Sequence, residues 1–231
     1  LIEQFDPEST FRRLTGLAAL FVTVVTVGLS AWHYYTAGFG LENEIAHRAI
    51  HLAVVLGLCF LVFPRQKRLP GPWEWVSSLA LMAFYLLLGF GLLNALNDPV
   101  PLGAQAVFIA VLLSVAALSM PFKAYDGSTT RIPLRDWIFA ALASGFSLYL
   151  LVNFQTIFIV RPGEHTPIDL MVGVIAIAMV IEATRRTMGI FLPLLAIATV
   201  LYGIFGPYLP GGLGHRGYSV PRVVAHLYKG T

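Results

Sequence analysis

Two carboxylates and an arginine pair bracket one long apolar stretch of the chain. Asp169 and Glu182 enclose twelve uncharged residues, and Arg185 and Arg186 follow directly. An ionisable side chain inside a membrane span is costly to bury, so such residues are candidates for carrying protons or ions. Glu182 could serve a proton relay, but it stands one helical turn from Arg186, where a structural ion pair at the end of a helix is the interpretation we favour. For Asp169 we favour a structural role at the start of a helix. Thr166 and Pro167 precede it, and its charge would face the positive end of the helix dipole.

Arg48 and His51 form a second candidate pair, one turn apart near the start of another apolar stretch. They could contact an anion, although we favour Arg48 extending toward lipid head groups and pairing with Glu44. The remaining candidates do not suggest chemistry. The histidines His165, His215 and His226 are scattered without metal-ligand spacing. The single cysteine, Cys59, lies within an apolar run and is expected to pack as a small hydrophobic side chain.

No sequence pattern typical of an enzyme is present. The chain contains no phosphate-binding loop, dinucleotide-binding glycine motif, nucleophile elbow or pair of catalytic acids. An integral-membrane enzyme would need His51, Asp169 and Glu182 at one depth in the membrane. The topology derived below places Glu182 on the opposite side from the other two, so we expect no enzymatic activity, no bound cofactor and no metal site.

Composition assigns the chain to the membrane. Of its 231 residues 57% are hydrophobic and only 12% are charged, whereas soluble domains are about 25% charged. The net charge is +3, and the basic residues stand in short clusters between apolar stretches. That distribution is typical of membrane topology and does not indicate a nucleic-acid partner.

The hydropathy pattern predicts an all-α integral membrane protein with about seven transmembrane helices, since about 20 apolar residues cross a bilayer. The predicted spans are residues 14–35, 45–63, 76–96, 102–120, 137–160, 168–184 and 188–208. Residues 1–13 are expected at the membrane surface. After residue 208 the density of Gly and Pro predicts turns, followed by a short surface helix at 222–228.

The positions of the basic residues predict the orientation. Ten of the 15 Lys and Arg residues fall in the segment before the first predicted span or in alternate loops after it: Arg12, Arg13, Arg65, Lys67, Arg68, Lys123, Arg131, Arg135, Arg185 and Arg186. Cytoplasmic loops are enriched in such residues. The N-terminus is therefore predicted to be cytoplasmic, and seven spans would place the C-terminal end on the periplasmic side.

Several motifs together resemble one transporter family. They lie at residues 48–52, at 132–137 with Asp136, at 161–169, in the Glu-Ala-Thr-Arg-Arg motif within 181–189, at 202–211, and at 215–219 with His215 and Arg216. In these stretches the chain resembles the N-terminal, small-subunit-like part of fused TRAP transporter permeases of the TAXI-associated type. The resemblance is strongest over residues 131–231 and weakest over 73–120, which is interpreted as a possible inserted helix pair.

The resemblance implies uptake of organic acids, such as dicarboxylates, driven by a sodium or proton gradient and fed by a periplasmic TAXI-type binding protein. The implied location is the cytoplasmic membrane of a bacterium or archaeon. Residues 14–184 would be a six-span scaffold, residues 185–208 a connecting transmembrane helix, and residues 209–231 a periplasmic loop and short helix. That last segment would lead into a large transport segment that contains the substrate and ion sites, so no substrate-binding residue is assigned here. The alternative is a self-contained membrane adaptor or assembly subunit without transport activity.

Overall fold

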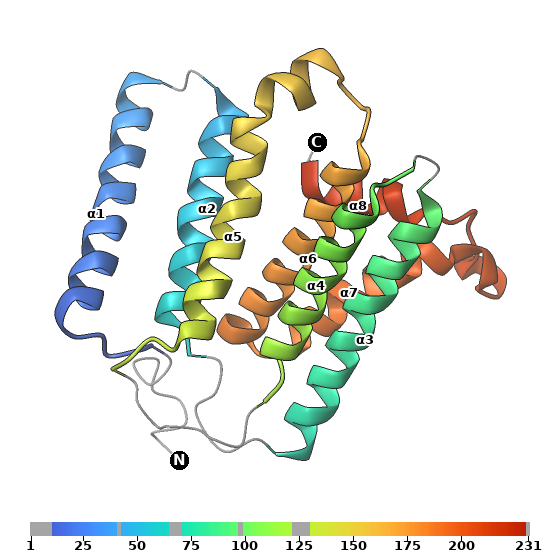
Figure 1. Ribbon diagram of the computed structural model, residues 1–231, viewed down its shortest axis with the longest axis horizontal. Coiled ribbons are helices and arrows are strands. Elements are labelled where there is room, and N and C mark those ends of the chain that lie inside the picture. The colour runs from blue at the N-terminus through green and yellow to red at the C-terminus, as the bar shows by residue number, and fades with distance from the viewer. Residues whose placement is uncertain (1–10, 41–42, 65–70, 97–98, 122–129, 230–231) are drawn as a thin grey trace. The chain divides into compact units, whose positions relative to one another are not determined.

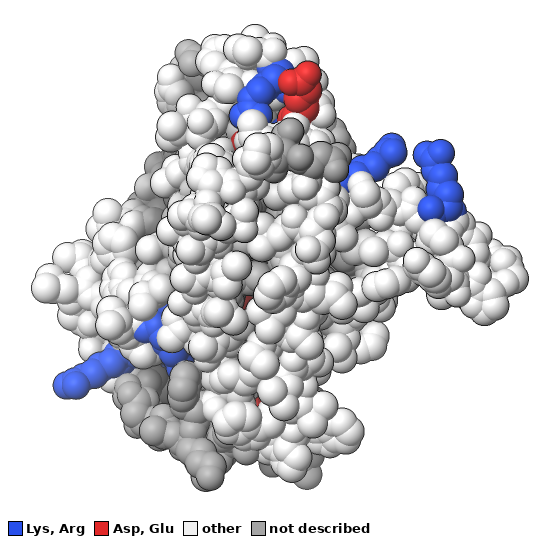
Figure 2. Space-filling view, turned by 45° about the vertical axis from the view of Figure 1, so that its right-hand side comes forward, with Lys and Arg blue, Asp and Glu red and all other residues white. Residues whose placement is uncertain are grey.

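The computed structural model of the protein describes residues 11–40, 43–64, 71–96, 99–121 and 130–229. Throughout these ranges the regular structure is helical and no strand occurs. Six helical segments are long and apolar enough to cross a membrane, and α4 is a shorter apolar helix. The face drawn in Figure 2 is largely free of charged side chains. The chain is therefore an all-helical, multi-pass membrane protein, while the count of seven spans stays a prediction.

The helices form two compact units, which are described separately. The first unit comprises residues 1–69 and 123–162, and the second comprises residues 70–122 and 163–231. The division of the chain after residues 184 and 208 was predicted from the resemblance to a transporter family, and it stays a prediction.

The first unit contains α1 (Gly16–Phe39), α2 (Glu44–Val62), α5 (Leu134–Val152) and a π-helix at Gln155–Val160 (Figure 1). Helices α2 and α5 bury matching stripes of side chains against each other. Gly57 allows the two backbones to approach, because a Cβ at this position would lie 2.7 Å from the hydroxyl of Ser144. That hydroxyl donates to the carbonyl of Ala53 at 2.9 Å. Close approach at small residues and hydrogen bonds between helices are what hold helices together in lipid.

Helix α1 differs from its neighbours, because none of its 24 residues is buried. It contacts α2, and the ring of Phe21 lies 6.0 Å from that of Trp137 on α5. Leu17 and Tyr34 are 85% and 82% exposed, which suits side chains that face lipid.

The predicted fifth span, residues 137–160, is not one continuous α-helix. Helix α5 ends at Val152, and Asn153 donates from both its backbone and its side chain to the carbonyl of Tyr149. Asparagine side chains compete in this way for backbone groups, which weakens helix interiors. The chain continues as the π-helix, in which Arg161 N–H bonds to the carbonyl of Thr156. Hydropathy did not indicate this change of helix type, because apolar character continues through it.

The second unit is built around α6 (Pro167–Met188). This helix contacts α3 (Pro72–Ala95), α4 (Leu102–Leu118), α7 (Phe191–Phe205) and α8 (Val220–Lys229). Short 3-10 turns at Gly206–Tyr208 and Gly211–Leu213 separate α7 from α8. Twelve residues of α6 are buried, so α6 is the centre of this unit.

Small residues on α6 and α3 permit this packing. A Cβ on Gly173 of α6 would lie 2.8 Å from Val224 and 3.2 Å from Tyr228, both on α8. A Cβ on Gly89 of α3 would lie 2.4 Å from Leu112 of α4. Helix α8 is therefore packed directly on α6, and it is three residues longer than the predicted helix at 222–228.

Candidate functional site

The start of α6 has the structure predicted from its sequence. Thr166 is the N-cap residue, and its hydroxyl accepts from the backbone N–H of Asp169 at 3.3 Å. The carboxylate of Asp169 accepts in return from the backbone N–H of Thr166 at 3.0 Å. This capping box satisfies two backbone donors that the helix itself leaves without partners. The cap role predicted for Asp169 is confirmed.

Asp169 has a further partner that was not predicted. It is 1% exposed, and the ammonium of Lys229, at the end of α8, lies 3.9 Å from its carboxylate. The same ammonium donates to the carbonyl of Glu164 at 2.6 Å. The carboxylate therefore helps to fasten the end of α8 to the start of α6.

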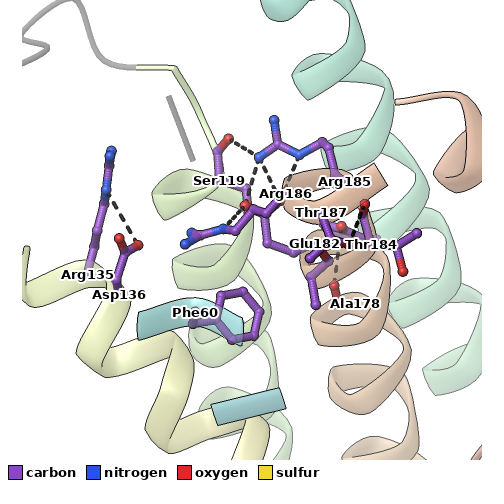
Figure 3. Close-up of polar contacts among 12 residues, drawn as sticks. Phe60, Ser119, Arg135, Asp136, Ala178, Glu182, Thr184, Arg185, Arg186 and Thr187 are labelled. Carbon is purple, nitrogen blue, oxygen red and sulfur yellow. Dashed lines mark hydrogen bonds and ion pairs between the residues drawn. The ribbon is translucent and has the colours of Figure 1, made fainter. Parts of the chain in front are cut away.

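Glu182 forms the centre of a second ion cluster, near the end of α6 (Figure 3). Arg185 binds its carboxylate through Nε at 2.9 Å and Nη2 at 2.6 Å. Arg186 binds it through Nε at 3.1 Å. Arg185 also donates to the carbonyl of Ser119 at the end of α4, at 3.4 Å. The predicted pairing of Glu182 with Arg186 is confirmed.

The environment of this cluster differs from the prediction. A weak ion pair at the edge of the bilayer was expected, but the side chains of Glu182 and Arg186 are fully buried and that of Arg185 is 11% exposed. The reason is that α3, α4 and α7 surround α6. A charge in such a place needs close partners, since an isolated buried charge costs several kcal/mol, on the order of 3–5 when one partner is removed.

Asp136 contributes to a corresponding cluster in the first unit, which sequence reasoning missed. Its side chain is completely buried and pairs with the guanidinium of Arg12. Arg135 lies 3.8 Å from the same carboxylate (Figure 3). In the sequence, Arg12 indicates only the orientation of the chain, and Asp136 is only part of a motif.

Arg12 also caps the end of α2. Its Nη1 donates to the carbonyls of Phe60 and Leu61 at 3.1 and 2.9 Å, and its backbone N–H donates to the carbonyl of Val62 at 2.9 Å. The last carbonyls of a helix have no partner within it and carry the negative end of its dipole. One arginine therefore joins the segment before α1 to α2 and α5.

Arg48 and His51 do not form a joint site. Arg48 pairs with Glu44 on an exposed face of α2, as predicted. His51 instead bonds to His33 of α1, with 2.8 Å between Nε2 of His33 and Nδ1 of His51. The signal for this contact is that both residues stand nine positions from residue 42, which lies between α1 and α2 in the sequence, so an antiparallel helix pair brings them to one level.

His215 and Arg216 lie in the segment between α7 and α8. A nitrogen of His215 lies 3.1 Å from the carbonyl of Tyr202, and the other accepts from the backbone N–H of Gly217 at 3.1 Å. A side chain on Gly206 would collide with the His215 ring. His215 therefore folds this segment back onto α7, while Arg216 is exposed.

These positions define what the predicted residues can do. Asp169 and Glu182 are thirteen residues apart on one helix, about 20 Å at about 1.5 Å per residue, so they cannot act on one substrate atom. Among the residues that the structure describes, no group of three or more His, Cys, Asp or Glu side chains is arranged to hold a metal ion. The arrangement supports helix packing through buried ion pairs. Comparison of the chain with protein-family models, with curated proteins and with solved structures gave no match.

Proposed function

We propose that this chain is the scaffold segment of a tripartite secondary transporter, located in the cytoplasmic membrane of a bacterium or archaeon. The transporter would import organic acids, such as dicarboxylates, using a sodium or proton gradient. A periplasmic TAXI-type binding protein would deliver the substrate, and a large transport segment would move it. The motifs at residues 131–219 support this family, and the basic loops support a cytoplasmic N-terminus.

One observation carries the scaffold role: both carboxylates of α6 are committed to fixed partners within this chain. Glu182 is surrounded by two arginines, and Asp169 belongs to a capping box and an ion pair. A moving transport segment would need carboxylates that exchange partners with ions or substrate. Groups bound this closely suit a segment that keeps its shape while another segment moves.

The test is transport by the full-length protein in liposomes, with the proposed periplasmic binding protein added. Uptake of labelled dicarboxylates and other organic acids is measured with and without a sodium or proton gradient. We expect uptake to require the gradient and the binding protein, and to be lost when residues 14–184 are deleted. A full-length protein with the substitution Val24→Leu, on the exposed face of α1, is the control and should transport normally.

Two results would contradict the proposal. Uptake at an unchanged rate after deletion of residues 14–184 would show that the segment is no scaffold for transport. A gene that encodes no further membrane spans after Thr231, with no transport partner that copurifies, would favour the self-contained adaptor.

A further inference from the structure

Helix α1 is fastened to its unit at two separated places. At its start, Arg12 binds the end of α2 and Asp136 of α5. Near its other end, Trp32 and His33 contact α2. Between these places none of the side chains of α1 is buried, and the ring of Phe21 contacts that of Trp137 at 6.0 Å. The orientation of α1 therefore depends strongly on the contacts at its far end.

Three imidazoles form that far contact, and we call His33, His47 and His51 the histidine cluster. The ring of His33 lies 5.0 Å from that of His47 and 4.9 Å from that of His51. The ring of Trp32 stacks on His47 at 4.4 Å with an interplanar angle of 29°. His33 is thus the central member, and it comes from α1 while its two partners come from α2.

The bond between His33 and His51 restricts how these two rings can be protonated. A hydrogen bond between two imidazole nitrogens needs one N–H donor and one unprotonated acceptor. Two neutral rings satisfy this, and so does one imidazolium beside one neutral ring. Two imidazolium rings cannot, because each nitrogen then carries a proton and the like charges repel. Protonation of both His33 and His51 therefore breaks the hydrogen bond between them.

We infer that the histidine cluster is a proton-sensitive latch between α1 and α2, closed while at most one of His33 and His51 is an imidazolium and open when both are. Histidine is the side chain whose charge changes between about pH 5 and 8, so mild acidification is the stimulus. The inference needs only the geometry of the first unit, and it stands or falls independently of the proposed transport function.

The other ionisable groups near the cluster do not supply a strong counter-charge. Glu44 and Arg48 share the helical stripe of His47 and His51, but they pair with each other and are exposed. On α1 the nearest such groups are Tyr34 and Tyr35, both exposed. Helix α5, which packs on α2, carries Tyr149 as its one titratable side chain after Asp136. Glu42, between α1 and α2 in the sequence, lies outside the described residues.

Opening the latch would reorient α1 without detaching it. The short connection from Gly40 to Asn43 keeps the adjoining ends of α1 and α2 near each other. Arg12 holds the opposite end through three carbonyls and one carboxylate. With both ends retained, loss of the ring contacts changes the tilt and rotation of α1 against α2.

The experiment measures the distance between α1 and α2 as pH changes. Spin labels are attached at Ala37→Cys and Leu52→Cys, both exposed sites, in the full chain with Cys59→Ala, reconstituted in lipid nanodiscs. Distance distributions are recorded by pulsed electron paramagnetic resonance from about pH 8 to about pH 5. We expect the distribution to shift or broaden on acidification and to recover when the pH is raised.

Two variants and a control identify the sensor. His33→Gln removes the central imidazole but keeps a polar side chain. It should give the same distance distribution at about pH 8 and at about pH 5. His51→Gln removes the other partner of the same bond and serves if His33→Gln does not fold. His226→Gln on α8 makes the same chemical change outside the cluster and should keep the shift. A parent distribution that does not change with pH, or a shift that persists in both cluster variants, would overturn the latch.

Discussion

Helices α1 and α6 are both long and apolar, yet they have opposite relations to the rest of the protein. Each passes the length and composition criteria for a membrane span. Of the residues of α1 none is buried, whereas twelve residues of α6 are. Because lipid is as apolar as a leucine side chain, apolar character does not decide whether a helix faces lipid or protein.

Small residues and paired charges make the difference. Helix α6 carries Gly173 at a tight contact with α8 and a fully buried carboxylate at Glu182. Helix α1 has no Asp, Glu, Lys or Arg, and its hydroxyls at Thr26 and Ser30 bond to carbonyls within the same helix. A helix becomes a packing centre when its buried charges are paired and its glycines admit neighbouring helices.

The largest effect is expected from breaking the buried cluster of α6. Glu182→Ala leaves Arg185 and Arg186 without their carboxylate, which should lower the free energy of unfolding by about 3–5 kcal/mol. Reversible unfolding in mixed detergent micelles measures this free energy of unfolding. The control is Glu44→Ala, which removes the exposed pair with Arg48 on α2 and should cost about 0–1 kcal/mol. Equal losses in the two variants would mean that burial does not distinguish the pairs.

A pair of glycine substitutions tests the packing difference directly. Gly173→Ala adds a methyl group 2.8 Å from Val224, and overpacking outweighs the gain in helix propensity, for a net loss of about 1–2 kcal/mol. Gly28→Ala on α1 meets nothing within 4 Å and should gain about 0.5–1 kcal/mol. The same unfolding assay compares them. Changes of the same sign would contradict the assignment of α1 as the unpacked helix.

The smallest effect concerns the start of α6. Thr166→Ala removes one half of the capping box and should cost about 1 kcal/mol, with faster hydrogen exchange at the amide of Asp169. Thr184→Ala on the same helix is the matched control, because its hydroxyl bonds only to the carbonyl of Val180. It should change stability by less than about 0.5 kcal/mol. An unchanged hydrogen-exchange rate at the amide of Asp169 in Thr166→Ala would show that the Thr166 cap does not stabilise the start of α6.

The features that sequence predicted well are local. The cap at Thr166, the pair of Glu44 with Arg48 and the pair of Glu182 with Arg186 all join residues within four positions, where helix geometry alone sets the distance. The helical segments followed from apolar runs of sufficient length. These rules need no knowledge of neighbouring helices.

What sequence missed depends on which helices meet. Asp136 and Arg12 are separated by 124 positions, and neither residue indicates the other. The burial of Glu182 follows from the helices around α6, and hydropathy gives no signal for those neighbours. The contact of His33 with His51 could have been predicted, because both residues stand nine positions from residue 42.

The anchor at Arg12 also constrains how the protein is made. Arg12 leaves the ribosome before α1, whereas its carboxylate partner, Asp136, is translated 124 residues later. The carbonyls at the end of α2 become available much earlier. During synthesis Arg12 can therefore engage α2 first and acquire its counter-charge only when α5 enters the membrane. The insertion of α5 is thus the step of biogenesis that completes the fastening of the first helix.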